Sequence, residues 1–141
     1  MAKKYMRCKV CGQIIEVVKD TGVPIVCCGE EMEELFPHLD DSIAKEKHVP
    51  VFKIKDGKID VKIGAIQHPS TTDHYIEWIA LETTKGSQRK DLKPGDTPQA
   101  LFTLSDGEIV KAIYAYCNIH ELWKVCVKEK RKPCGCELDM E

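Results

Sequence analysis

The sequence predicts an all-β protein built mainly of antiparallel strands. Short segments alternate apolar and polar residues, as in 58–63, where Ile59, Val61 and Ile63 share one face. Tight-turn signals separate such segments, among them Asp56-Gly57 and Ser105-Asp106-Gly107. Nowhere does a long 3.6-residue periodicity indicate an amphipathic helix. Together these features favour paired strands over helices.

The chain opens with a small cysteine-rich segment. A strand is expected over 13–19, and Asp20-Thr21-Gly22 predicts a turn. Such a unit, of about 30 residues, is too small to be held by apolar burial alone, so a bound metal would supply the missing stability. The four candidate ligands form two pairs, Cys8 with Cys11 and Cys27 with Cys28.

Four thiolates on one ion suit either Zn(II) or a single iron. Iron could pass an electron, or either metal could serve only as a structural staple. Neighbouring residues usually point apart, so the adjacent pair is unusual. Glycines follow both pairs, at Gly12 and Gly29, where a positive φ lets backbone N–H groups point at sulfur.

The next segment, Glu30–Asp41, is acidic and contains Pro37. It is interpreted as a linker with one helical turn, in which His38 is exposed or caps the turn. We therefore expect four parts: a metal domain at 1–37, a linker and lid loop at 38–47, a second domain at 48–127 and a loose tail at 128–141.

Strand candidates follow along the second domain. The alternation in 74–81 places His74, Ile76, Trp78 and Ala80 on one face and Tyr75, Glu77, Ile79 and Leu81 on the other. Residues 83–97 are polar and are expected to form a turn region. Six or seven strands in all predict an immunoglobulin-like antiparallel β-sandwich. The remaining strand candidates are 51–55, 100–104, 108–116 and 122–128.

Composition and charge restrict which partners and which cellular compartment are expected for the chain. The net charge of −2 argues against nucleic acid as a partner. No apolar run approaches the ~20 residues that cross a membrane, and the N-terminus lacks the apolar core of a signal peptide. A cytoplasmic location is therefore expected, where the 8 cysteines are interpreted as metal ligands before disulfides.

A second donor set is scattered along the sandwich domain. Taken singly, each histidine is an ordinary hydrogen-bonded rim residue. As a set, the residues lie next to turns or prolines, where a sandwich can gather ligands from distant segments. The set comprises His48, His68, His74, Cys117 and His120.

The types of donor atom narrow the choice of metal among zinc, copper and iron. Zinc prefers four ligands in a closed tetrahedron. Blue copper takes two histidines, a cysteine and a nearby axial methionine, but Met140 lies far from Cys117 in the sequence. Four imidazoles in a plane with an axial thiolate would fit iron and leave one position open.

These residues carry a resemblance that covers nearly the whole chain up to about Val127. The chain resembles the desulfoferrodoxin family, the two-iron superoxide reductases. The motifs occur in the family's order: Cys8-x-x-Cys11 with Cys27-Cys28, Glu46-Lys47-His48-Val49-Pro50, His68-Pro69 with His74-Tyr75-Ile76-x-Trp78, and Cys117-Asn118-x-His120.

The resemblance implies a desulforedoxin-like N-terminal domain with a rubredoxin-type iron on the four N-terminal cysteines. It implies a second iron with four equatorial histidines, His48, His68, His74 and His120, and axial Cys117. It further implies that Lys47 attracts superoxide and assists protonation, while Glu46 can occupy the open position of the ferric metal. The reaction would be one-electron reduction of superoxide to hydrogen peroxide.

The electron donor that the resemblance implies is a small protein such as rubredoxin. A homodimer is expected because the N-terminal unit is too small to bury its apolar face alone. The rival interpretations are an iron or copper electron carrier without a substrate, and a zinc-binding structural module. The chain departs from the family at Glu121, where glycine is usual. Cys126 is interpreted as a small buried apolar residue, and Cys134 and Cys136 as solvated thiols of the tail.

Overall fold

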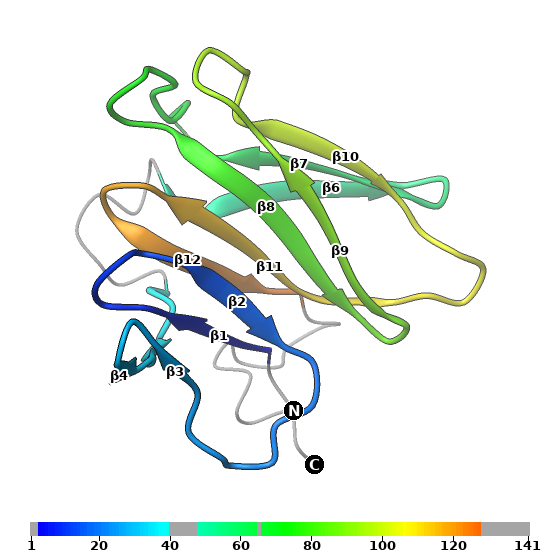
Figure 1. Ribbon diagram of the computed structural model, residues 1–141. Helices are drawn as coiled ribbons and strands as arrows, with labels where there is room; N and C mark the ends of the chain where they lie inside the picture. Colours follow the sequence, from blue (N-terminus) through cyan, green and yellow to red (C-terminus); the bar gives the residue numbers. More distant parts are fainter. Residues whose placement is uncertain (1–2, 40–47, 65, 128–141) are drawn as a thin grey trace. The chain divides into compact units, whose positions relative to one another are not determined.

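The computed structural model describes residues 3–39, 48–64 and 66–127 (Figure 1). The chain divides into two compact units, of which the first ends at Phe36 and the second begins at Pro37. All the named elements of both units are β-strands. The predicted all-β class is thereby confirmed. The boundaries expected for the linker and the tail fall largely outside the described residues and stay predictions.

The first unit is built from five short strands. A three-stranded antiparallel sheet has the order β2-β1-β5, and β3 and β4 form a small antiparallel pair beside it. Tyr5, Met32 and Leu35 form the buried apolar centre of this unit. The strands are β1 (Lys4–Arg7), β2 (Ile14–Val17), β3 (Val26–Cys27), β4 (Glu30–Glu31) and β5 (Glu33–Leu35).

The interpretation of Glu30–Asp41 as a linker with a helical turn is wrong for its described part, because β4 and β5 lie there. Charge pairing explains how an acidic segment joins a sheet. Arg7 of β1 lies opposite Glu33 of β5, and the guanidinium Nη2 is 2.8 Å from the carboxylate. Leu35, two residues on and therefore on the same face as Glu33, is buried, whereas Glu34 between them is exposed.

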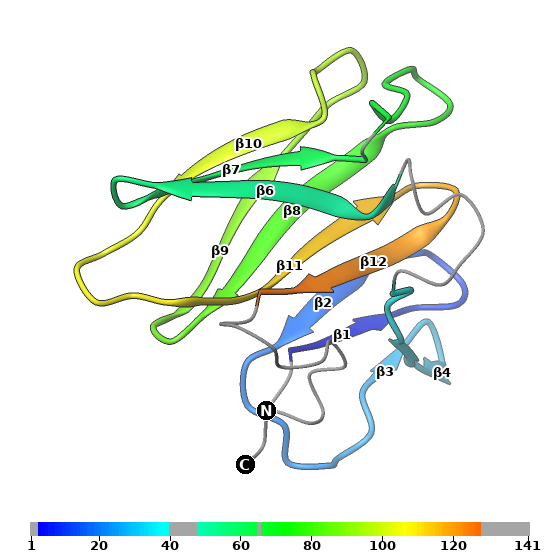
Figure 2. The same cartoon turned by 180° about the vertical axis from the view of Figure 1, so that it is seen from behind.

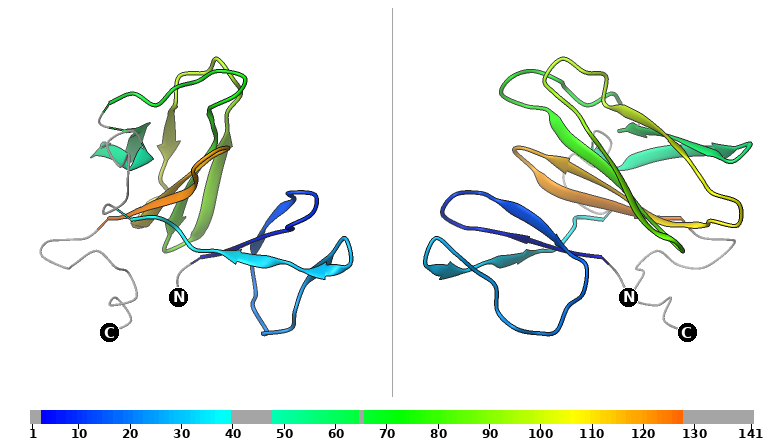
Figure 3. Two further views of the ribbon diagram at one scale, coloured as in Figure 1. Left: turned by 90° about the vertical axis from the view of Figure 1, so that its left-hand side faces the viewer. Right: turned by 45° about the vertical axis from the view of Figure 1, so that its right-hand side comes forward.

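The second unit is an antiparallel β-sandwich, as predicted. One sheet has the order β10-β7-β6 and the other β12-β11-β8-β9, and the two sheets face each other (Figures 1 and 2). The side views separate the two layers (Figure 3). The strands are β6 (Pro50–Lys55), β7 (Lys58–Ile63), β8 (Ile76–Thr83), β9 (Gly86–Asp91), β10 (Gln99–Thr103), β11 (Val110–Cys117) and β12 (Glu121–Cys126).

The hairpin at Asp56-Gly57 is confirmed. β6 and β7 pair in register from Pro50 opposite Ile63 to Lys55 opposite Lys58. Asp56 and Gly57 both have positive φ, at 54° and 75°. Two consecutive residues of this kind are what a type I′ turn requires, and its twist matches that of the strands it joins.

The turn region expected at 83–97 is wrong in part, because β9 occupies Gly86–Asp91 within it. β9 is the edge strand of its sheet and pairs only with β8 among the described strands. Five of its six residues are exposed. An edge strand with solvent on both faces needs no apolar alternation, and its Arg89 and Lys90 are typical of edges that resist further pairing.

The strict alternation predicted for 74–81 is also wrong, because a β-bulge interrupts β8. Tyr116 of β11 lies opposite Trp78, whereas Cys117 lies opposite Ile76, so Glu77 is an extra residue on β8. As a result Ile76 joins the same buried core as Ile79 and Leu81. A bulge carries one additional residue and resets which face the following side chains occupy.

The core of the second unit lies between the two sheets. Central strand β11 contributes Ile113, Ala115 and Cys117, all fully buried, and β7 contributes Ile59, Val61 and Ile63 from the facing sheet. Within the described residues, no helix has the length and apolar character needed to cross a membrane.

Replacing Ile113 by alanine should lower the free energy of unfolding by about 2–5 kcal/mol, because it leaves a cavity at a fully buried site. Chemical denaturation of the full chain measures this. Ile109→Ala removes the same atoms from a side chain that is 55% exposed and should cost about 0.5 kcal/mol or less. Equal losses in the two variants would contradict the assignment of the core.

Candidate metal centres

The first candidate centre lies in the first unit. The sulfur atoms of Cys8, Cys11, Cys27 and Cys28 all lie within 4.8 Å of one another. Cys8 and Cys11 flank the turn after β1, Cys27 ends β3, and Cys28 follows it. The sequence prediction that these four residues come together agrees with this geometry.

The spacing of these sulfurs fits a tetrahedral ion. The Sγ atoms of Cys11 and Cys27 are 3.8 Å apart, and those of Cys27 and Cys28 are 3.9 Å apart. Four thiolates at about 2.3 Å from a central metal would lie about 3.8 Å from one another. Zn(II) and a single iron both accept such a site.

Backbone N–H groups stabilise negative charge on the sulfur of Cys8. The N–H groups of Cys11 and Val10 each donate to Cys8 Sγ at 3.4 Å. These bonds, with that from Cys11 the stronger, lower the pKa of Cys8 to about 6. Hydrogen bonds that the Cys27 thiol donates to the sulfurs of Cys8 and Cys11 raise the pKa of Cys27 to about 12. The cluster thus shares its protons unequally until a cation displaces them.

The backbone explains how two adjacent cysteines can face the same ion. Cys28 has a φ of 54°, and Gly29 after it has a φ of 77°. This left-handed conformation turns the Cys28 side chain back toward Cys27 Sγ. The predicted positive φ at Gly12 and Gly29 is confirmed. The positive φ at Cys28 was not predicted, because non-glycine residues adopt this conformation only at an energetic cost.

The second candidate centre lies in the second unit, at one end of the sandwich. Ligand atoms of His48, His74, Cys117 and His120 all lie within 4.8 Å of one another. His48 precedes β6, His74 precedes β8, Cys117 ends β11, and His120 lies in the turn before β12. Segments far apart in the sequence therefore meet here, as predicted.

His68 joins this cluster beside His48. The two Nε2 atoms are 3.1 Å apart. The Nδ1 atom of His68 is 2.7 Å from the carbonyl oxygen of Pro69, and this contact places the ring proton on Nδ1 and leaves the Nε2 lone pair facing the cluster. Burial lowers the pKa of His68 to about 4, which keeps its imidazole neutral and able to bind a metal.

The four imidazoles form a ring in the order His48, His68, His74, His120. Neighbouring ring centroids are 4.6, 4.7, 5.2 and 4.7 Å apart, whereas the diagonal from His48 to His74 is 6.2 Å. His48 Nε2 is 3.1 Å from both His68 Nε2 and His120 Nδ1. Neighbouring nitrogens of a square plane at about 2.1 Å from a metal would be about 3.0 Å apart, against about 3.4 Å in a tetrahedron.

Cys117 supplies a fifth donor. Its side chain is fully buried, and its sulfur is 3.8 Å from His120 Nδ1. Burial raises the pKa of this thiol, and the negative charge of Glu77 adds to the effect. The backbone N–H groups of His120 and Ile119 act in the opposite direction. The His120 N–H lies 3.4 Å from the sulfur, so the turn itself partly solvates a thiolate.

Trp123 holds two of the histidines in place. Its ring stacks on His48 at 4.7 Å, and its Nε1–H donates to the backbone carbonyl of His120 at 3.0 Å. On another side it packs against the exposed ring of His38, which forms an isolated bridge with Trp123 and is not part of a helical turn. These contacts depend on the fold, because His38 and His48 are far from Trp123 in the sequence.

Asn118 ties the loops of two ligands together. Its side-chain oxygen accepts from the backbone N–H of Tyr75 at 2.9 Å, and its Nδ2 donates to the carbonyl of Asp73 at 3.0 Å. These two residues flank His74, and Asn118 itself follows Cys117. The amide therefore fixes the distance between the two ligand segments. Asn118 belongs to the sequence motif Cys117-Asn118-x-His120, but its role depends on loop contacts that the sequence alone does not show.

Several residues named from the sequence stand apart from both centres. Lys47 and Glu46 lie outside the described residues, as do Cys134 and Cys136, so these assignments stay predictions. Glu121 has a φ of 70°, which explains why glycine would suit that position. Cys126 is buried, as expected, but it takes part in a disulfide and is not simply an apolar residue.

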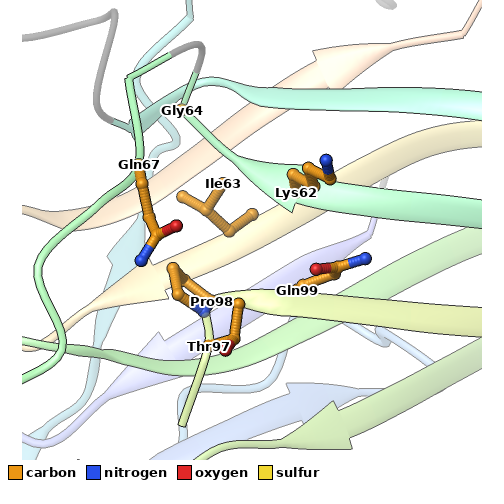
Figure 4. A pocket seen from close by; sticks show the side chains of 7 residues that line it. All are labelled: Lys62, Ile63, Gly64, Gln67, Thr97, Pro98 and Gln99. Carbon is orange, nitrogen blue, oxygen red and sulfur yellow. The ribbon is translucent and has the colours of Figure 1, made fainter. Parts of the chain in front are cut away.

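A hollow of about 220 Å³ lies next to the His68 loop (Figure 4). It contains none of the nine candidate ligands, and Lys62 is its only charged side chain. Gln67, the residue before His68, extends over it toward Pro98. The hollow therefore lies beside the segment that leads to His68, and none of the candidate ligands lines it. Its lining residues are Lys62, Ile63, Gly64, Gln67, Thr97, Pro98 and Gln99.

The chain matches known proteins over most of its length. The model of the desulfoferrodoxin N-terminal domain matches residues 2–35, and that of desulfoferrodoxin matches residues 40–126. A desulfoferrodoxin homolog from Archaeoglobus fulgidus is 44% identical over 118 residues, which are 84% of this chain and 92% of the relative.

Two solved structures are also similar. The superoxide reductase from Treponema pallidum has a TM-score of 0.73 and 30% identity, covering 87% of this chain and 96% of its own. The one-iron superoxide reductase from Giardia intestinalis has a TM-score of 0.52 and 34% identity, covering 60% of this chain and 100% of its own.

Fold and donor sets together define a two-unit β-protein with a four-cysteine site and a site of imidazoles with one thiolate. The chain belongs to the desulfoferrodoxin family.

Removing single ligands should affect the two centres independently, because each site is closed by residues of its own unit. An iron–thiolate bond absorbs visible light, so Cys117→Ser should remove only the visible absorption of the second centre. A Cys27→Ser, Cys28→Ser double variant should remove only the colour of the first. Metal analysis and visible spectra of anaerobically purified protein measure both, and loss of both centres in either variant would contradict two separate sites.

Proposed function

We propose that the protein is a superoxide reductase, which converts superoxide to hydrogen peroxide by adding one electron and two protons. The observation that carries the proposal is the ring of four imidazoles with a buried thiolate beside it. The similarity to proteins named superoxide reductases supports the same activity.

We assign His48, His68, His74, His120 and Cys117 as the residues that would hold the second iron. The nitrogen spacing of 3.1 Å supports a planar arrangement. Cys8, Cys11, Cys27 and Cys28 are assigned to the first iron on the basis of their tetrahedral sulfur spacing. Zinc in the second site is disfavoured because five donors exceed its usual four.

When bound in the second site, iron supplies the single electron and an exchangeable position for the small anion. The chain's own residues prepare that position. His120 is exposed, whereas His48, His68 and Cys117 are buried, so access is from the His120 side. Four neutral imidazoles leave the metal's charge largely uncompensated, which attracts an anion. The buried thiolate of Cys117 would favour electron donation by the bound metal.

The first centre is assigned a relay or a structural role, with a small rubredoxin-type protein as the electron donor. Superoxide is the substrate, and the reaction takes place in the cytoplasm. These assignments follow from the proposed activity and from the reduced thiols that both sites need.

The activity is tested by mixing the reduced protein with known amounts of superoxide. A reductase forms one hydrogen peroxide per superoxide and releases no oxygen, whereas a dismutase releases oxygen from half of the superoxide. Azide should also bind to the oxidised second centre and change its spectrum. A protein whose reduced second centre is oxidised only slowly by superoxide, and which binds no azide, would be an electron carrier instead.

Lys47→Ala should slow the capture of superoxide by roughly tenfold at low ionic strength, because the lysine that directly precedes His48 in the sequence would supply a cation that steers the anion. Pulse radiolysis measures the rate, and metal content should not change. Lys55→Ala removes an exposed lysine at the far end of β6 and serves as the control. Unchanged capture by Lys47→Ala would remove the steering role.

A homodimer is proposed to form through the first unit, which exposes several apolar side chains. Val18 is 93% exposed, Val23 70% and Val26 63%. Changing Val18 and Val23 together to aspartate should weaken the dimer by at least about tenfold, because two charges would be buried at the contact. Sedimentation of the holoprotein measures this, with Ile54→Asp on the second unit as control. A monomeric wild type would refute the proposal.

A further inference from the structure

The bulge in β8 places an acidic residue beside the thiolate of the second centre. Glu77 is the extra residue between Ile76, which lies opposite Cys117, and Trp78, which lies opposite Tyr116. It therefore sits at the level of Cys117, on the strand paired with it. Bulges are frequent next to active sites, where they redirect a side chain.

The side chains on either side show which way Glu77 points. Trp78 and Tyr116 stack on each other at 5.7 Å on one face of the sheet. Ile79 and Cys117 belong to the core on the opposite face. Counted back from Ile79, on the regular side of the bulge, alternation places Glu77 on the face of Ile79 and Cys117, and the bulge puts Ile76 on that face as well.

The carboxylate is poorly compensated in this position. Glu77 is partly buried, and burial raises its pKa. No hydrogen bond or ion pair to its side chain occurs among the described residues, whereas Glu82 on the same strand accepts from the Tyr114 hydroxyl. The strand register places this carboxylate beside the end of β11 that carries Cys117.

We propose that Glu77 acts through Cys117 to favour the oxidised state of the second iron. Resting on the proposed function, this inference identifies Glu77 as a positioning residue that sets the centre's reduction potential. A fixed negative charge near the thiolate stabilises the ferric state, which carries one more positive charge than the ferrous state. The ferrous protein therefore gives up its electron more readily.

Glu77→Gln tests the inference, since it removes the charge and keeps the size of the side chain. The expected result is a higher midpoint potential for the second centre. At a fixed applied potential the ratio of ferric to ferrous iron should fall by about tenfold, the size of effect expected of one charge several ångströms away. Spectroelectrochemical titration of the holoprotein measures both centres, and the first centre serves as an internal reference.

Two further variants separate charge from structure. Glu77→Asp keeps the charge and should stay within about threefold of the wild-type ratio. Glu82→Gln alters the same strand away from Cys117 and should leave the potential unchanged. An unshifted potential in Glu77→Gln, or an equal shift in Glu82→Gln, would overturn the inference. The proposed function is tested separately by the superoxide assay on wild-type protein, so the two can fail independently.

Discussion

The pairing of β11 with β8 on one side and β12 on the other is the constraint on which the second centre depends. Cys117 ends β11, and the turn after it carries His120 before β12 begins. The β8 side brings the segment that contains His74 to the same level. Because β11 is central in its sheet and its inner face is fully buried, these donors cannot drift apart without breaking the core.

In both centres the distances between neighbouring donor atoms are close to those expected around a bound metal ion. Sulfurs of the first centre lie 3.8 and 3.9 Å apart, and nitrogens of the second lie 3.1 Å apart. Without a cation, such groups must share protons, and the unequal pKa values of Cys8 and Cys27 are one result. Metal binding relieves this crowding, so its free energy also contributes to folding.

Much of the architecture could be predicted from sequence because it depends on local signals. Asp56-Gly57 encodes its own turn, and the donors are recognisable by residue type and by adjacency to turns or prolines. The features that the sequence did not predict depend on contacts between distant parts of the chain. β9 is a polar edge strand with no alternation to detect, β5 is recruited by its pairing with β1, and the bulge at Glu77 depends on register with β11. Cys28 adopts a backbone conformation that its residue type disfavours.

Trp123 links two ligands mechanically. One face of its indole lies against the ring of His48, and its N–H is bonded to the backbone of His120. A displacement of either ligand must therefore move a large, fully enclosed ring. Such a site has little freedom to change its bond lengths or angles between oxidation states. Its reorganisation energy should accordingly be small, and electrons should enter and leave the centre quickly even when the driving force is modest.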